Sequence, residues 1–543
     1  MVVFNLFQAK PPRLLRRRHL RGGGTYAEAA SSSANGETRA LGEEEEWPET
    51  WDRNKVYMYK DPDGNKVPVP HGFTVSGAES EKYVNHNVEM RGTWEELTFH
   101  SEGDYPWTQN NDGVWQSGNY NVANSTSALE SDEFTVGEDG GYLNIEWCIS
   151  SQARADLLSI EATNIDTGIV KELTKISGTN FGTNYNSLIY TKYNVEFEKG
   201  TYLLTIKYSK NSSSNVGLDS GYLKHGAILK YNDTGESTVI IHKYGGFVIY
   251  EGEISVANAG AWTEQETWNA SINKNQFVWV PVTNLSRIYS ETQSKKKISK
   301  LWSFNTNNAN GREPAILKEA YDDRIRLLLN ENCTKDIFYK ELITEFSKTI
   351  DSIKKYGGFY IGRYETGNIL SNTPVVKRLN SELGNVNWYT AYTRMKNIST
   401  NKNIHTSMIW GCLWDETLQW FIDTNQRTQT EIAICSDSWG NYIYSDFEYH
   451  DGTGIINKSG IKKIPTGSTE RNKSNNIYDM AGNIAEWTLE ASDNRTSRIM
   501  RGGSALYNIS NSQNTQPVSY RYNATANSDN YRYGHGCRAF FYI

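Results

Sequence analysis

The sequence predicts an α+β protein in which an antiparallel β-sandwich is inserted into a second, mixed domain that follows an extended N-terminal arm. Three observations predict this organisation. A chain of 543 residues is too long for one hydrophobic core. Aromatic residues reach 12% although hydrophobic residues are only 37%, and 44 Gly against 12 Pro favour tight turns in β-rich domains. A strand pattern also stops near Asn87 and resumes near Gly245.

Residues 1–53 are expected to form the arm. Basic residues crowd the stretch from Lys10 to Arg21, and an acidic run from Glu43 to Glu46 follows. Such a segment has few apolar side chains with which to offset its ordering entropy. We interpret it either as a solvated tail or as a docking arm that orders against other proteins of a virion or surface assembly.

The mixed domain is expected in two parts, residues 54–87 and 245–543. Turn chemistry at residues 61–64 separates β-branched and aromatic runs at 55–60 and 67–75, and similar runs occupy 245–250 and 275–282. Apolar spacing of three and four residues then predicts helices. The predicted helices cover residues 313–321, 336–355, 388–397 and 415–423, the second one stopping at Gly357 and Gly358.

Residues 88–244 are expected to form the inserted sandwich. Period-two segments at 141–147, 157–162, 187–197 and 201–208 are separated by Gly, Asn and Ser clusters, without a helical pattern between them. Exposed Trp rings on such a sandwich can contact a glycan, and Trp107 and Trp115 are the candidates. The alternative is that both rings are buried between the two sheets.

Composition limits the function. The net charge of −7 argues against a protein that mainly coats nucleic acid or an anionic membrane. The five Cys are widely spaced, so neither a disulfide framework nor structural zinc is expected. No apolar window is long enough for a membrane span, and the first residues do not form a secretory signal. We therefore expect a cytoplasmic protein or one released by lysis in a virion.

Four ordered segments carry a family resemblance. They are residues 358–366, residues 414–420, the run Asp479-Met-Ala-Gly-Asn-Ile-Ala-Glu-Trp487, and Arg501-Gly-Gly-Ser504 with residues 534–539. Together they resemble the formylglycine-generating enzyme family, also called the sulfatase-modifying-factor domain. The resemblance covers about residues 54–87 and 245–543. It implies a C-type-lectin-like fold, rich in irregular structure, for the mixed domain.

The central run predicts a tight turn with oxygen ligands. Gly482 permits a left-handed turn, Asn483 can bond its own backbone, and Glu486 supplies a hard oxygen of the kind that calcium prefers. The resemblance implies a calcium ion held by the side chains of Asp479 and Glu486 and the carbonyls of Gly482 and Ile484. The alternative is that no metal binds and that Glu486 caps local amides or pairs with Arg501 or Arg538.

The resemblance does not imply the family's chemistry. Active members use copper, oxygen and a pair of thiolates, whereas the corresponding positions, near Tyr507 and Ser519, hold no Cys. Cys537 replaces an aromatic residue in the closing signature, and we expect it to be buried. We therefore expect the domain to be non-catalytic. The alternative is a divergent metal-dependent oxidase with ligands among His405, His450 and His535, although none of these has a metal-ligand spacing.

Relatives without the chemistry imply a binding role. In variable receptor-binding proteins of phages and bacteria, the C-terminal loops of this fold are diversified by a retroelement and bind the ligand. Tyr and Asn, which make adaptable binding surfaces, are frequent between Tyr507 and Tyr533. We predict a virion-associated or surface-displayed adhesin that recognises a host-cell glycan or protein receptor, with a trimer as the expected assembly; the alternative is a structural decoration or collar protein. The predicted ligand residues are Tyr507, Asn508, Asn511, Asn514, Tyr520, Tyr522, Asn523, Asn527, Asn530, Tyr531 and Tyr533.

Overall fold

The computed structural model confirms that the protein is rich in β-structure. Of the described residues, 41% lie in strands and 17% in helices, so sheets set the architecture. The described ranges are 38–41, 56–60, 64–76, 78, 81–82, 86–152, 155–177, 188, 190–212, 215–243, 246–252, 264–291, 297–299, 334–371, 373–433, 436–443, 445–491, 497–506, 517–526 and 534–543.

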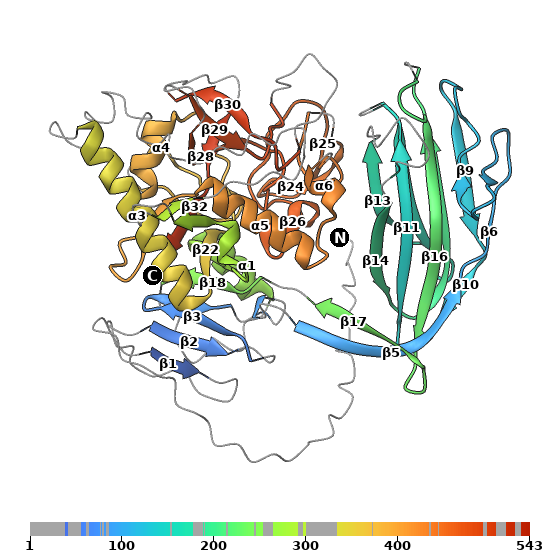
Figure 1. Ribbon diagram of the computed structural model, residues 1–543, viewed down its shortest axis with the longest axis horizontal. Helices are drawn as coiled ribbons and strands as arrows, with labels where there is room; N and C mark the ends of the chain where they lie inside the picture. The colour runs from blue at the N-terminus through green and yellow to red at the C-terminus, as the bar shows by residue number, and fades with distance from the viewer. Residues whose placement is uncertain are drawn as a thin grey trace.

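A six-stranded sheet, ordered β23-β32-β22-β19-β18-β4, forms the centre of the mixed domain (Figure 1). Its strands are short and almost wholly buried, because side chains on both faces pack into one large apolar core. The sheet joins the start of the domain to its last residues, since β4 and β32 both belong to it. Its strands are β4 (Phe73–Val75), β18 (Val248–Glu251), β19 (Gln276–Pro281), β22 (Gly358–Gly362), β23 (His405–Met408) and β32 (Ala539–Tyr542).

Helices pack around this sheet. The longest, α3, has Thr334 as its N-cap, whose hydroxyl accepts a hydrogen bond from the Ile337 amide, and ends at Gly357 in the left-handed conformation. In α5 nearly every side chain is buried, Asp415 and Glu416 included. The predicted helix at 313–321 lies outside the described residues. The helices are α1 (Glu264–Asn273), α3 (Lys335–Tyr356), α4 (Trp388–Met395), α5 (Gly411–Asp423) and α6 (Gln429–Ala433), with 3-10 turns η4 (Leu285–Arg287) and η7 (Glu470–Asn472).

A four-stranded sheet, ordered β30-β29-β28-β31, carries the motif residues at the C-terminal end of the chain. Part of the predicted arm also enters a sheet, because residues 38–41 form β1, which pairs in parallel with β2. The strands outside the central sheet and the sandwich are β1 (Thr38–Leu41), β2 (Val56–Lys60), β3 (Lys66–Pro70), β20 (Tyr289–Glu291), β21 (Lys297–Ser299), β24 (Phe447–His450), β25 (Ile455–Lys458), β26 (Lys473–Ser474), β27 (Ile477–Tyr478), β28 (Ala485–Ala491), β29 (Ser497–Arg501), β30 (Tyr522–Thr525) and β31 (His535–Cys537).

Two further sheets form a sandwich with its own apolar core (Figure 1). One sheet is ordered β14-β11-β16-β5-β17 with β7 and β8 attached, and the other β13-β12-β15-β9-β6 with β10 attached. Alternate side chains of β11 and β12 are buried, as their period-two sequences require. The strands are β5 (His86–Glu96), β6 (Phe99–His100), β7 (Thr108–Gln109), β8 (Trp115–Gln116), β9 (Thr126–Ser131), β10 (Phe134–Val136), β11 (Gly141–Ser150), β12 (Leu157–Asn164), β13 (Val170–Ser177), β14 (Thr191–Phe197), β15 (Gly200–Ser209), β16 (Ser220–Tyr231) and β17 (Ser237–Lys243).

The sandwich interrupts the central sheet between two neighbouring strands. The chain leaves after β4 and returns at β18, and these two strands pair with each other, Ile249 opposite Val75. The outgoing and returning segments also pair, because β5 and β17 form an antiparallel ribbon with His86 opposite Lys243 (Figure 1). Gly92 lies where β5 passes from this ribbon into the sandwich sheet, and a β-carbon there would lie 2.3 Å from the carbonyl oxygen of Lys230.

Besides this ribbon, a side-chain contact joins the sandwich to the mixed domain. The hydroxyl groups of Thr191 in β14 and Thr430 in α6 lie 3.2 Å apart and are buried. Nearby, burial together with the charge of Glu431 raises the pKa of Tyr193 to about 12. The edge of the sandwich therefore contacts α6 of the mixed domain.

Within the described residues, no helix has both the length and the apolar character that crossing a bilayer requires.

Candidate functional site

The predicted metal-binding turn lies beside the central sheet and is wholly buried. Asp479, Gly482 and Asn483 all have positive φ, of 55°, 75° and 59°. A β-carbon on Gly482 would lie 2.1 Å from the carbonyl oxygen of Asn441, so only glycine fits there. The amide of Asn483 donates to the same carbonyl and so holds the turn against the segment that contains Asn441.

Asp479 accepts three hydrogen bonds from protein donors. One carboxylate oxygen accepts hydrogen bonds from the Thr466 hydroxyl (2.9 Å) and the Gly467 amide (2.7 Å). The other accepts from the side-chain amide of Asn472, at 2.9 Å. Burial raises the pKa of Asp479 in spite of these donors.

Glu486 forms a buried, two-pronged ion pair with Arg538. The guanidinium donates from Nε (3.0 Å) and Nη2 (2.7 Å) to the two carboxylate oxygens. Burial raises the pKa of Glu486 to about 7, although Arg538 opposes the shift. Burial, with the nearby charges of Asp479 and Glu486, also raises the pKa of Glu365, which accepts from the side-chain amide of Asn483 at 2.5 Å. The charge of Arg538 thus acts on three buried carboxyl groups, and its guanidinium is bonded to the one on Glu486.

This arrangement matches the ion-pair alternative for Glu486, with Arg538 as the partner. A calcium ion does not fit these side chains as they stand, because the oxygens of Asp479 and Glu486 already accept protein hydrogen bonds and Arg538 supplies the positive charge. The described residues contain no group of three or more His, Cys, Asp or Glu side chains arranged to hold a metal. No step of the proposed function uses calcium.

A second buried cluster, which we call the four-charge ring, joins α5, β28, β29 and the residue before β30. Asp415 accepts from Arg501 and Arg521, both at 2.5 Å. Glu490 accepts from the same two guanidinium groups, at 3.1 and 2.8 Å. Each charge therefore faces two of opposite sign. One feature of the sequence points to this ring. Asp415 lies within the apolar sequence of α5, and an Asp is costly to bury without partners.

The four-charge ring anchors the predicted ligand-binding segment, because Arg521 belongs to both. Residues 517–526 are tied to the core at further points. The Trp414 indole donates to the carbonyl of Val518, the Val518 amide to the Ser436 hydroxyl, and the Ser519 amide to the carbonyl of Ile432. At the other end, the Trp388 amide donates to the carbonyl of Ala526.

Three of the predicted ligand residues belong to this anchored segment. Tyr520 and Tyr522 are half-buried and Asn523 is exposed. The others lie outside the described residues, so the structure does not place them relative to these three. They are Tyr507, Asn508, Asn511, Asn514, Asn527, Asn530, Tyr531 and Tyr533.

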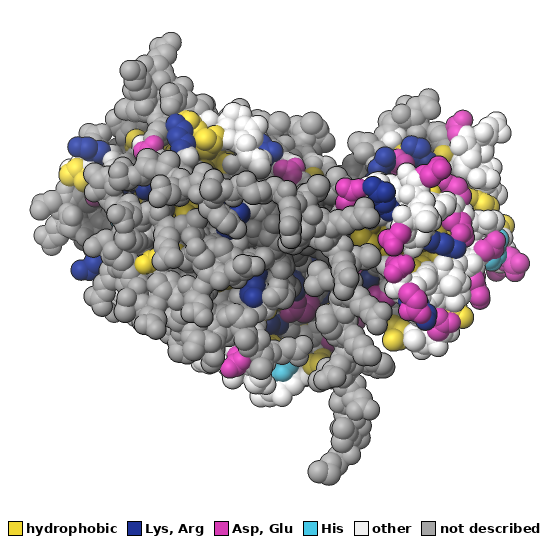
Figure 2. Space-filling view, turned by 90° about the horizontal axis from the view of Figure 1, so that it is seen from below, with side chains coloured by type: hydrophobic (Ala, Val, Ile, Leu, Met, Phe, Trp, Pro, Cys, Tyr) yellow, Lys and Arg dark blue, Asp and Glu magenta, His cyan; other side chains and the backbone are white. Residues whose placement is uncertain are grey.

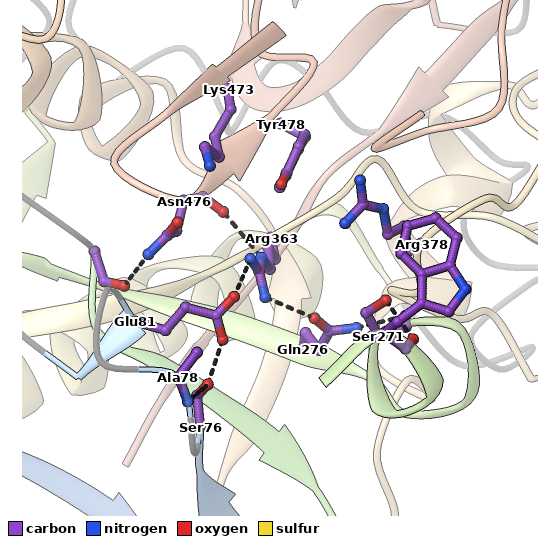
Figure 3. Close-up of polar contacts among 12 residues, drawn as sticks. Ser76, Ala78, Glu81, Ser271, Gln276, Arg363, Arg378, Lys473, Asn476 and Tyr478 are labelled. Carbon is purple, nitrogen blue, oxygen red and sulfur yellow. Dashed lines mark hydrogen bonds and ion pairs between the residues drawn. The ribbon is translucent and has the colours of Figure 1, made fainter. Parts of the chain in front are cut away.

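A third polar cluster, which sequence reasoning missed, centres on Arg363 (Figure 3). Its guanidinium donates to Glu81 (2.5 Å), to the Tyr250 hydroxyl and the Gln276 side chain (both 3.0 Å), and to the carbonyl of Asn476 (3.2 Å). Although burial opposes ionisation, Arg363 and the hydroxyl groups of Ser76 and Tyr250, which donate to Glu81, hold the pKa of Glu81 below its usual value. The pair fastens the segment that leads to the sandwich onto the central sheet.

The two predicted glycan-contacting Trp residues differ in burial. Trp107 is 3% exposed and belongs to the sandwich core, so its ring is not available to a ligand; the burial alternative is correct for this residue. Its ring packs into the core between the sheets, 3.2 Å from where a β-carbon on Gly221 would be. Trp115, in β8, is half-buried and packs against the same core.

The residues considered for oxidase chemistry lie on separate elements. His405 in β23 stacks on Tyr542, with ring centres 5.1 Å apart, and burial lowers its pKa. His450 in β24 accepts a hydrogen bond from the Gly452 amide, and His535 in β31 packs edge-on against Trp487. Cys537 is fully buried, which raises the pKa of its thiol. The corresponding catalytic-pair position near Ser519 is a buried serine, and Tyr507 lies outside the described residues.

Comparisons with known proteins define no family. No family model matches the chain, and no curated protein matches it. Among solved structures, the chain is similar to the K1 cleaved adhesin domain of Lys-gingipain from Porphyromonas gingivalis W83, at 12% identity over 27% of this chain and 99% of that one, with a TM-score of 0.20. The C-terminal CBM6 of LamC from Zobellia galactanivorans is 15% identical over 27% of this chain and 100% of that one, with a TM-score of 0.18.

A third similar structure is the secreted serine protease VesC from Vibrio cholerae. It is 14% identical over 26% of this chain and 25% of that one, with a TM-score of 0.18. At these TM-scores the similarities define neither the fold of the whole chain nor its function.

Proposed function

We propose that this chain is a non-catalytic binding protein whose ligand surface is built on residues 507–533. The observation that carries the proposal is the anchorage of residues 517–526. Arg521 closes the buried four-charge ring, and the backbone of Val518, Ser519 and Ala526 bonds to the core. A segment held at both ends, with polar and aromatic side chains at the surface, is the fixed base that a recognition site needs.

The chemistry of the anchored segment suits recognition of a surface ligand. Tyr520 and Tyr522 offer large, amphipathic rings with few rotatable bonds, and Asn523 offers both a donor and an acceptor. β30 is also the terminal strand of its sheet as described, pairing with β29. A ligand can therefore contact side chains and strand edge together.

We further propose the domain type, the attachment and the receptor that the sequence predicts. The C-terminal domain is a C-type-lectin-like, non-catalytic relative of the formylglycine-generating enzymes. Residues 1–53 attach it to a virion or another surface assembly, which is released by lysis, and the receptor is a glycan or a protein of a host cell.

The test is binding of the labelled full-length protein to a panel of bacterial cells. In one variant, residues 507–516 and 527–533 are replaced by Gly-Ser segments of equal length, while residues 517–526 are kept so that Arg521 stays in the ring. In a second variant, Tyr522→Ala removes one half-buried ring from the anchored segment. We expect the first variant to lose cell binding and the second to bind about tenfold more weakly.

Tyr120→Ala is the matched control, because Tyr120 is a Tyr that is 54% exposed on the sandwich. Because Tyr522 also packs against the core of the mixed domain, binding of Tyr522→Ala and of the control is compared at a temperature at which both variants are folded. If the loop-replaced protein binds cells as well as the original, residues 507–533 are not the ligand surface and the proposal is wrong.

A further inference from the structure

The outward face of the sandwich sheet that contains β11 carries aligned aromatic side chains. Trp94 in β5 lies opposite Leu229 in β16, Leu229 lies opposite Tyr142 in β11, and Tyr142 lies opposite Glu196 in β14. Opposite residues of antiparallel strands share a face. The preceding pair, Ile228 opposite Leu143, belongs to the core between the sheets. The row that contains Trp94 and Tyr142 therefore points away from that core.

The rings of this row form a surface and not a second core. Trp94 is 37% exposed and Tyr142 is half-buried. Leu229, between them, is fully buried although it points outward, so its neighbours on this face cover it. The ring of Tyr231, two residues further along β16, lies 3.5 Å from where a β-carbon on Gly140 would be.

Tyr231 gives a second observation that points to a ligand. Its hydroxyl is buried and has no hydrogen-bond partner among the described residues. Burial raises the pKa of Tyr231, and the charges of Glu196 and Tyr142 add to this shift. A buried hydroxyl without a partner costs free energy, so a polar ligand group that reached it after a shift of the covering side chains would be favoured.

The rows beside the rings carry planar hydrogen-bonding groups and paired charges. The side-chain amide of Asn144 donates to that of Asn194 at 2.6 Å. Glu146 pairs with Lys224 at 3.1 Å, and Glu96 with His225 at 3.3 Å. Lys224 balances the charge of Glu146, and His225 is a polar partner of Glu96, while the amides keep further donor and acceptor capacity.

We propose that this outer face, formed by Trp94, Tyr142, Asn144, Asn194, Glu196 and Tyr231, binds a neutral oligosaccharide. Sugar rings present an apolar face and a rim of hydroxyl groups, and this surface offers aromatic faces together with amide and carboxylate groups at their edges. Trp94 and Tyr142 lie two strands apart, which is about 9.6 Å at the usual strand spacing, so the occupant is a chain of sugars.

The observations favour this occupant over others. A polyanion would need a surplus of basic groups, whereas Glu96, Glu146 and Glu196 lie on this face beside Lys224. Acidic and basic side chains are also interspersed on the side of the sandwich that Figure 2 shows. A protein partner of the usual kind would bury a continuous apolar patch, whereas the apolar residue between the rings, Leu229, is already covered. The site lies on a different domain from residues 507–533, so it goes beyond the proposed function and does not depend on it.

The test is binding of the full-length protein to an array of neutral oligosaccharides printed beside sulfated ones, followed by calorimetric titration of the strongest neutral ligand. We expect Trp94→Ala and Tyr142→Ala each to weaken binding about tenfold or more. Asn144→Ala, which leaves the rings in place, should weaken it less. Tyr120→Ala, an exposed Tyr elsewhere on the sandwich, should leave the affinity unchanged.

The proposal is wrong if no neutral oligosaccharide binds or if only sulfated ones bind. It is also wrong if the variants bind the neutral ligand as tightly as the original protein does. That comparison uses Asn144→Ala and each ring variant whose thermal unfolding matches that of the original protein. The two proposals can fail separately. The loop-replaced protein should keep its oligosaccharide affinity, and Trp94→Ala should keep the cell binding that residues 507–533 provide.

Discussion

Individual charged residues in the mixed domain are buried in sets that compensate one another. The four-charge ring joins Asp415 and Glu490 to two guanidinium groups, and Arg538 faces Glu486. An isolated charge at these positions would be very unfavourable, so the value of each residue depends on its partners. The consequence is that removing one partner is far more destructive than its own contacts suggest.

Asp415→Asn should destabilise the mixed domain by about 3–5 kcal/mol. The change leaves Arg501 and Arg521 with Glu490 as their remaining carboxylate in the ring, in a site where Asp415 and Arg501 are fully buried. Urea unfolding followed by tryptophan fluorescence measures the loss. Glu138→Gln, which breaks the exposed Lys199 pair, is the control and should leave the unfolding midpoint unchanged. A loss below about 1 kcal/mol for Asp415→Asn would contradict the coupled ring.

Glu486 predicts a pH dependence of stability. Its pKa is about 7 in the folded protein and near 4.5 when unfolded, so between these values the folded state binds the extra proton. The free energy of unfolding should therefore fall as pH rises from about 4.5 to about 7, with no further change from this group above that range. Unfolding at pH 4.5, 6 and 7.5 tests this. Glu486→Gln should make the slope shallower by the share of this group, while Glu365 and Asp479, whose pKa values are also raised, keep a slope of the same sign. An unchanged slope in that variant would assign the effect to other groups.

At the scale of elements, some strands and helices follow from local sequence and others do not. The spacing at residues 336–355 predicts a helix, and α3 covers Lys335–Tyr356, because its N-cap and glycine stop are local signals. α1 was not predicted, since its sequence, Glu264–Asn273, is polar on most sides and the packing of Trp268 and Ala270 decides its position. Tertiary contacts thus replace the missing amphipathic pattern.

The turn before β28 gives a prediction for one element. Gly482→Ala should destabilise the mixed domain by about 3 kcal/mol or more, because it adds a clash with the Asn441 carbonyl to the cost of a positive φ. Gly452→Ala is the matched control, since Gly452 also has positive φ but open space around it, and about 1 kcal/mol is expected. Equal losses in urea unfolding would show that the clash is relieved by movement of the turn.

At the scale of the whole molecule, the sandwich and the mixed domain have separate apolar cores. They are joined by the β5–β17 ribbon, and β4 and β18 remain neighbours in the central sheet. The described side contact joins Thr191 and Thr430, with Tyr193 near Glu431. Domains with this arrangement depend little on one another for stability.

Excision of residues 86–243, with a short Gly-Ser turn in their place, should leave a folded mixed domain. Glu81 stays in the excised protein, so its ion pair with Arg363 still fastens the segment after β4. The expected result is cooperative urea unfolding at nearly the midpoint that the full chain shows for this domain. Residues 86–243 expressed alone should also unfold cooperatively. A mixed domain that fails to fold without the sandwich would show that the contact at α6 is essential.

The sequence by itself determined the β-rich character, the period-two strands of the sandwich and the glycine turn at Gly482, because these depend on neighbouring residues along the chain. Only the tertiary structure decided which charges pair, since Asp415 meets Arg501 and Arg521 across 86 and 106 residues. It also decided which aromatic rings reach the surface. Local alternation does not say which phase of β5 faces the core, so the exposure of Trp94 could not be read from its strand. Trp107 precedes β7 and is buried by contacts that no strand pattern predicts.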